Sequence, residues 1–161
     1  MDDELFPKVL EDLYDLEDDL EEDDSEEIVG YKEAPYFDSQ LGDFRIDGHG
    51  RIITADGVTA WSQWCENILA TDRYNHESYT DDIGIDYEEI FQTAETQEEA
   101  ETLLETEITE ALLCDPYGRT KYVQGIEFDW TGPDEVTVNI EVVGMDNELI
   151  TISKDLSLSA T

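Results

Sequence analysis

The sequence predicts an α+β fold in which two main helices pack on a small antiparallel sheet. Apolar residues recur every three or four positions over residues 58–70 and 100–112, which is the period of an amphipathic helix. From residue 126 onward they alternate with polar residues, which is the period of a strand with one buried face. The 161 residues are enough for one ordinary domain with an appended segment.

The first 30 residues are predicted to form an acidic helical extension, and the main domain is placed at residues 31–161. A helix is expected over residues 5–20, where Pro7 stands in the first turn, a position that proline tolerates. Residues 21–27 are nearly all Asp and Glu, which is typical of a linker. So short a helix is marginal in water, so its apolar stripe is expected to bind either this protein's own body or a partner. The stripe consists of Phe6, Val9, Leu13, Leu16 and Leu20.

A short hairpin is expected near the start of the main domain and is counted as part of the sheet. Residues 44–46 and 51–53 flank the sequence Asp47-Gly48-His49-Gly50, which is typical of a tight turn. The preceding residues 31–43 contain Pro35 and Gly42 and are expected to be irregular.

Helices are expected in the middle of the chain. The first covers residues 58–70 and carries two tryptophans on its apolar face. A short helical stretch follows at residues 87–91. The second long helix begins at Thr96, where Thr-Gln-Glu-Glu forms a capping-box pattern, and it ends before Asp115-Pro116.

The last third of the chain is predicted to be a three-stranded antiparallel meander. Apolar and polar residues alternate over residues 126–130, 136–142 and 150–152. Turn residues separate these runs at 132–134 and 144–147. We expect one face of this sheet to pack on the helices.

The net charge of −36 excludes several classes of partner. The chain has 44 acidic and 8 basic residues, so its surface repels nucleic-acid phosphates and anionic membranes. Residues 1–30 account for −14 (1 basic and 15 acidic), which leaves −22 for the remainder. Acid spread over the whole surface fits a protein that works in concentrated salt, because salt at 1 M screens charges over roughly 3 Å. We therefore hypothesise a halophilic source.

No cofactor, metal or catalytic motif stands out. The two cysteines, Cys65 and Cys114, lie among apolar residues and are expected to be buried free thiols. With 44 carboxylates, the sequence cannot select a pair for glycoside hydrolysis. The N-terminus is acidic and no long apolar run occurs, so no signal peptide or membrane span is expected. A non-enzymatic interaction module is favoured.

The most informative polar cluster is Thr71-Asp72-Arg73-Tyr74, which directly follows the first main helix. Arg73 is expected to be ion-paired in so acidic a protein. Its guanidinium could hold the loop of residues 71–85 in shape through carboxylate contacts. The alternative is a local contact between a cation and the last carbonyls of the helix.

Four stretches that follow one another along the chain together resemble one known family: 56–74, Tyr79 with Gly84-Ile85, 107–115, and Val123 with Ile126–Phe128. The family that they resemble is the contractile-tail sheath initiators, also described as lysozyme-like baseplate wedge proteins, in their Bacillus defective-phage branch. The family carries Glu where this chain has Asp72, a change that keeps the charge. The resemblance covers roughly residues 43–153.

The resemblance implies a structural protein of the virion tail baseplate, assembled in the host cytoplasm. Such a protein connects the baseplate to the first sheath ring, which docks by adding extended arms to its sheet, a mode called β-augmentation. Its partners would be the tail sheath protein, other baseplate wedge subunits and the tail tube or hub. We expect the strand at 148–154, with Ile150, Ile152 and Lys154, to be the edge that is used. The helix at 5–20 would bind a neighbouring wedge subunit.

Two other functions stay open at the level of sequence. One is a glycan hydrolase of the tail tip, which the lysozyme-like name suggests. The other is an acidic adaptor protein unrelated to tails. The sequence does not decide between a virus and a cellular injection system.

Overall fold

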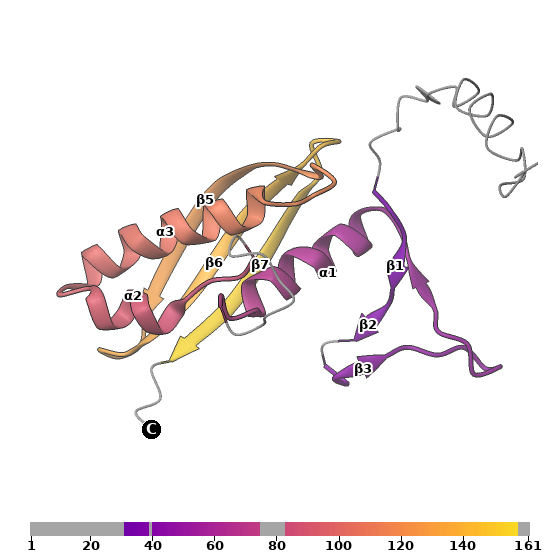
Figure 1. Cartoon of the computed structure of the whole chain (residues 1–161), viewed down its shortest axis with the longest axis horizontal. Helices are drawn as coiled ribbons and strands as arrows, with labels where there is room; N and C mark the ends of the chain where they lie inside the picture. Colours follow the sequence, from indigo (N-terminus) through magenta and orange to yellow (C-terminus); the bar gives the residue numbers. More distant parts are fainter. Residues whose placement is uncertain (1–30, 39, 75–82, 158–161) are drawn as a thin grey trace, which may run out of the picture.

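The computed structural model describes residues 31–38, 40–74 and 83–157, so the predicted helix at 5–20 and its linker lie outside the described residues. The described part is an α+β fold, as predicted, with three helices and small antiparallel sheets (Figure 1). None of its helices is long and apolar enough to cross a membrane. The elements in chain order are β1 (Ala34–Pro35), β2 (Phe37–Asp38), β3 (Asp43–Phe44), β4 (Thr54–Ala55), α1 (Gly57–Ala70), α2 (Tyr87–Thr93), α3 (Gln97–Leu113), β5 (Thr120–Trp130), β6 (Glu135–Gly144) and β7 (Leu149–Ser157).

The predicted meander is confirmed as an antiparallel sheet with strand order β5-β6-β7. Alternate residues of the central strand β6 are buried against the helices, which cover one face of the sheet (Figure 1). The other face carries polar side chains such as Thr137, Asn139 and Glu141, which are half-buried. Because the sequence alternates with a period of two, apolar residues lie on the face that packs on the helices and polar residues lie on the opposite face. The buried residues on the helix-facing side of β6 are Val136, Val138, Ile140 and Val142, and Val143 near the end of the strand is also buried.

The two main helices supply the other half of the core. One face of α1 is buried, and Trp61 at its centre is completely inaccessible to solvent. Helix α3 begins with the predicted cap, because the Thr96 hydroxyl accepts a hydrogen bond from the Glu99 amide at 3.2 Å. The Glu99 carboxylate in turn accepts from the amide of Glu95 at 3.0 Å. The third helix, α2, extends the stretch predicted at 87–91 by two residues.

The predicted N-terminal hairpin forms, but the prediction that it belongs to the same sheet as the meander was wrong. Ile46 bridges to Ile52 across the expected turn, in which the Gly50 amide donates to the Asp47 carbonyl at 3.0 Å. These residues pair only with other residues of 31–55, a segment we call the arm, and not with the meander. Residues 31–43 are also less irregular than expected, because they contain β1 and β2. Pro35, which lacks an N–H, limits the ladder to short pieces.

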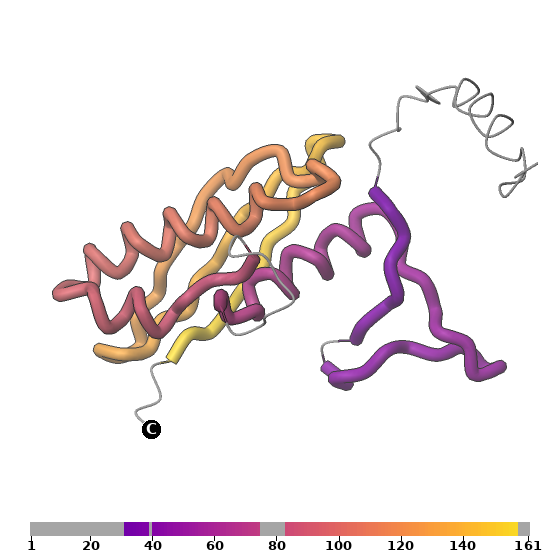
Figure 2. Tube along the Cα trace, in the orientation of Figure 1, coloured from indigo at the N-terminus to yellow at the C-terminus, as the bar shows by residue number. Residues whose placement is uncertain are grey.

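The arm is a three-way backbone junction that extends beyond the first turn of α1, away from α2 (Figure 2). The Tyr36 amide donates to the Ile53 carbonyl, the Ile53 amide to the Arg45 carbonyl, and the Arg45 amide to the Tyr36 carbonyl, at 2.8–2.9 Å. The Gln63 side-chain amide ties the arm to α1 by donating to the Phe37 carbonyl at 2.7 Å. Large apolar side chains of the arm remain exposed: Leu41, Phe44, Ile46, Ile52 and Ile53.

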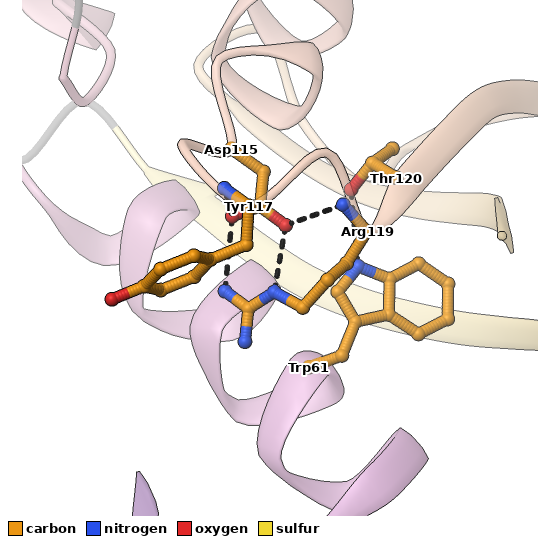
Figure 3. Close-up of polar contacts among 5 residues, drawn as sticks. All are labelled: Trp61, Asp115, Tyr117, Arg119 and Thr120. Carbon is orange, nitrogen blue, oxygen red and sulfur yellow. Dashed lines mark hydrogen bonds and ion pairs between the residues drawn. The ribbon is translucent and has the colours of Figure 1, made fainter. Parts of the chain in front are cut away.

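A buried ion pair holds the turn between α3 and β5 (Figure 3). The Arg119 guanidinium donates to both carboxylate oxygens of Asp115, at 2.8 and 3.0 Å, and both side chains are almost inaccessible. The same carboxylate accepts from the backbone amides of Tyr117 and Arg119. Next to this turn, the Trp61 indole N–H donates to the Thr120 hydroxyl at 3.0 Å. The turn therefore fixes β5 against the centre of α1.

Both cysteines are free thiols, as predicted, but they differ in exposure. Cys65 faces the core, and burial raises its pKa to about 12. Cys114 is only half-buried, because it follows the last turn of α3 where the chain reaches the surface.

We expect Asp115→Asn to lower the free energy of unfolding by about 3–5 kcal/mol, because it leaves the buried Arg119 charge without its partner. The matched control is Asp129→Asn, which removes one exposed carboxylate from β5 and is expected to change stability by less than about 0.5 kcal/mol. Urea unfolding of both variants measures the difference. Equal midpoints for the two variants would show that the ion pair is not a main support of the fold.

Candidate assembly site at the end of α1

Four segments of the chain meet at the C-terminal end of α1. The Leu69 carbonyl accepts a hydrogen bond from the Lys154 ammonium at 2.6 Å and another from the Tyr87 hydroxyl at 2.8 Å. Helix α1 has no basic residue in its own last turn, so Lys154 of β7 supplies the cation that the helix dipole favours there. Burial lowers the pKa of Lys154, although the nearby Asp72 charge opposes this, and burial raises the pKa of Tyr87.

The predicted cluster 71–74 lies at this junction, and Arg73 points into the protein. Its guanidinium donates to the Gly84 carbonyl at 3.0 Å and forms an ion pair with Glu107 of α3 at 2.7 Å. The Thr71 hydroxyl donates to the Asn67 carbonyl, which caps the helix. Asp72 forms a parallel bridge with Ile85. The Arg73 guanidinium therefore contacts segments that are distant from the adjacent helix end.

Tyr74 lies outside this network and faces solvent. Its side chain is 66% exposed, and its backbone has φ of +67°, a conformation that residues with a large side chain seldom adopt. The backbone thus turns Arg73 inward and Tyr74 outward within two residues. An aromatic ring held at the surface in this way is available for contact with another molecule.

Gly84 lets the two sides of the loop come together. The Ile85 amide donates to the Thr71 carbonyl at 3.0 Å, and the Arg73 amide donates to the Ile85 carbonyl at 3.3 Å. A Cβ atom on Gly84 would lie 2.4 Å from the Thr71 carbonyl oxygen, and φ of Gly84 is +91°. Both features require glycine at this position.

The strand beside this junction, β7, is an edge of the meander. Its nine residues pair with β6 in unbroken register. At the hairpin end, the Gly144 amide donates to the Glu148 carbonyl, so this pair of opposite residues is hydrogen-bonded. Hydrogen-bonded and non-hydrogen-bonded pairs alternate along an antiparallel ladder. Residues 150, 152, 154 and 156 of β7 are therefore hydrogen-bonded to β6. The backbone groups of residues 149, 151, 153, 155 and 157 point away from β6.

Residues 35–147 match the sequence model of the contractile injection system sheath initiator family. This chain belongs to that family. A search among curated proteins found no match. Sheath initiators are structural components of contractile tails, so membership implies a place in the tail or baseplate and contacts with sheath and baseplate components.

The β7 side chains expected to bind partners of this sheath initiator face the helices. Ile152 is buried in the core, Ile150 is half-buried against it, and Lys154 contacts Leu69. The period of two explains this result, because any alternation that turns Ile150 and Ile152 inward also turns Lys154 inward. Their role in partner binding stays a prediction, as does that of the stripe at Phe6–Leu20, which lies outside the described residues.

Two residues of this site in the sheath initiator, Tyr87 and Glu107, do not stand out in the sequence, although each forms a half-buried polar contact here. Arg119, which lies in the turn between α3 and β5, was likewise not singled out. The scarcity of cations could have pointed to the arginine contacts, because in so acidic a chain each arginine is expected to have a carboxylate partner. Within the described ranges, no group of three His, Cys, Asp or Glu side chains is placed to hold a metal ion.

We expect Gly84→Ala to destabilise the protein by about 1–3 kcal/mol more than Gly118→Ala does. Gly118 is the matched control because it also has positive φ, +60°, but no atom lies within 4 Å of its added Cβ. Chemical denaturation of both variants gives the comparison. Equal losses would mean that the loop at 71–85 moves to accommodate a methyl group and does not depend on close backbone approach.

Proposed function

We propose that this chain connects the baseplate of a contractile tail to the first sheath ring and starts sheath assembly by β-augmentation. An extended arm of the tail sheath protein would add to β7 as a fourth strand. The observation that carries the proposal is the row of outward backbone donors and acceptors at alternate residues from 149 to 157. In β-augmentation such main-chain groups supply the affinity.

The two edges of the sheet differ in a way that supports the choice of β7. Strand β5 has two register shifts, between Thr120 and Tyr122 and between Val123 and Gly125, and irregularities of this kind disfavour further pairing. Strand β7 has no register shift and no proline. Its single cation, Lys154, is turned inward and bonded to the Leu69 carbonyl. The strand thus lacks two of the usual protections against pairing, a bulge and a proline.

The junction at the end of α1 would set the position of this edge. Lys154 links β7 to α1, and Arg73 links the loop that follows α1 to α3. We propose that Arg73 organises this loop, with Thr71 and Asp72, and that Tyr74 contacts another baseplate component. The stripe of residues 5–20 would bind a neighbouring wedge subunit in the assembled baseplate, and the tail tube or hub would lie close to it.

The charge of the chain suggests the conditions under which it works. A net charge of −36 opposes compaction unless counterions screen it, so we propose that the particle, viral or cellular, comes from a salt-rich environment. The same charge disfavours contact with nucleic acid or anionic membrane.

Proline substitution at the outward edge tests β-augmentation. Ser153→Pro removes an amide that points away from β6, so the β6–β7 ladder keeps its hydrogen bonds while the edge loses a central donor. We expect this variant to fold and to reduce polymerisation of sheath protein on baseplates at least about tenfold. Ser153→Ala is the matched control, because it keeps the amide and is expected to assemble normally.

The readout is the number of sheathed particles counted by electron microscopy after reconstitution with each variant. Circular dichroism of the isolated variant establishes that the fold is kept. Normal sheath assembly by a folded Ser153→Pro protein would overturn the β7 proposal, while family membership would be unaffected.

A further inference from the structure

A groove runs along α1 on the side where the arm and the α3–β5 turn approach it. One part, of about 620 Å³, lies between the arm and α1, and a second, of about 330 Å³, lies near the C-terminal end of α1. The two parts share Trp64 and Asn67 of α1, so they adjoin along this helix and are treated together as one groove. Its lining is mainly apolar and aromatic. We call it the α1 groove, and its principal residues are Phe37, Phe44, Trp64, Ile83, Cys114 and Tyr117.

The α1 groove is close to electrically neutral in a strongly acidic protein. Its charged lining residues are Lys32, Glu33 and Arg119, and Asp115 compensates the charge of Arg119. Residues 56–161 as a whole carry 4 basic and 25 acidic residues, a net charge of −21. Lys32 lies near the exposed Tyr117, with its ammonium 4.4 Å from the ring centroid. An acidic ligand is therefore repelled less here than by the rest of the chain.

The chain itself contains a segment with matching chemistry. The residues Phe6, Val9, Leu13, Leu16 and Leu20 repeat at helical spacing among acidic residues. As a helix, this stripe would be roughly 21 Å long, and α1 from Ala60 to Thr71 measures about 16 Å, at about 1.5 Å per residue. The stripe is therefore about one helical turn longer than this part of α1. It matches the groove in apolar character, as in the helix-in-groove mode of recognition.

The linker of residues 21–30 is long enough for the stripe to reach the α1 groove. Tyr31 is the first described residue, and the two residues that follow it, Lys32 and Glu33, line the groove, so the described chain begins beside the groove. Residues 21–30 can span at most about 33 Å when extended, which is longer than the groove. A segment tethered this closely has an effective concentration in the millimolar range.

We propose that, in the free protein, residues 5–20 of the same chain occupy the α1 groove. The apolar stripe covers the aromatic lining, and the acidic face stays in solvent. The stripe is then unavailable to other proteins until a baseplate subunit competes for it. This inference is independent of the proposed sheath contact at β7, since it concerns the isolated chain.

Cys114 provides a direct test because its half-buried thiol lines the groove, whereas Cys65 is buried in the core. The experiment compares the alkylation rate of Cys114 in the full chain and in Leu13→Ser/Leu16→Ser, in about 1 M salt. We expect the double variant to react about tenfold faster, since a groove affinity of about 0.1 mM leaves about one tenth of the tethered molecules open. The substitutions lie outside the described fold and do not alter its core.

The matched control is Glu11→Gln/Asp18→Asn, which changes the opposite side of the same predicted helix and is expected to keep Cys114 protected. A second readout is the indole N–H resonance of Trp64, which should shift in the Leu variant. The chemical shifts of the Trp61 and Trp130 indole N–H groups should not change, because these groups donate hydrogen bonds to Thr120 and Glu101.

Each other outcome overturns the proposal. Equal alkylation rates in all variants would mean that the groove is open in the free protein and takes only a partner. If Cys114 of the full chain were alkylated faster after tenfold dilution of the protein, a second copy of the chain would be supplying the stripe. A faster rate in the acidic-face control would mean that charge, and not the apolar stripe, controls access to Cys114.

Discussion

The scarcity of positive charge is the constraint on which the rest of this structure depends. Only eight of the 161 residues are Lys or Arg, and Lys8 lies outside the described part. Each of the other seven contacts a carboxylate, a polar oxygen or an aromatic ring, and most of these contacts join two segments. Arg119 closes the turn into β5, Arg73 joins a loop to α3, and Lys154 joins β7 to α1. A chain with so much acid holds its fold by placing its few cations where segments meet.

The regular elements could be predicted because one apolar face determines each of them. Helices α1 and α3 and the meander follow from a period of 3.6 or 2, and burial in the structure obeys that period. The arm could not be predicted in the same way. Its strands are two residues long, and its shape depends on backbone bonds among Tyr36, Arg45 and Ile53, which leave no trace in side-chain pattern.

Several side-chain ion pairs could also not be predicted from sequence patterns. Asp115 and Arg119 are four residues apart, a spacing that suggests a helix, but Pro116 and Gly118 place them in a turn. The pairing of Arg73 with Glu107 depends on how α3 packs beside the loop, so no local pattern reports it. By contrast, the inward direction of Lys154 follows from the same alternation that buries Ile152, and the sequence contains that information in full.

The unbroken register of β7 has a mechanical meaning. Hydrogen bonds of an antiparallel ladder lie across the strands, so tension along a strand stretches all of them together instead of one after another. The ladder between β6 and β7 continues for nine residue pairs without a bulge. A pull along β7 is therefore shared across its whole length, and the contact of Lys154 with Leu69 passes part of it to α1. The sheet of this small protein is built to resist shear along its exposed edge.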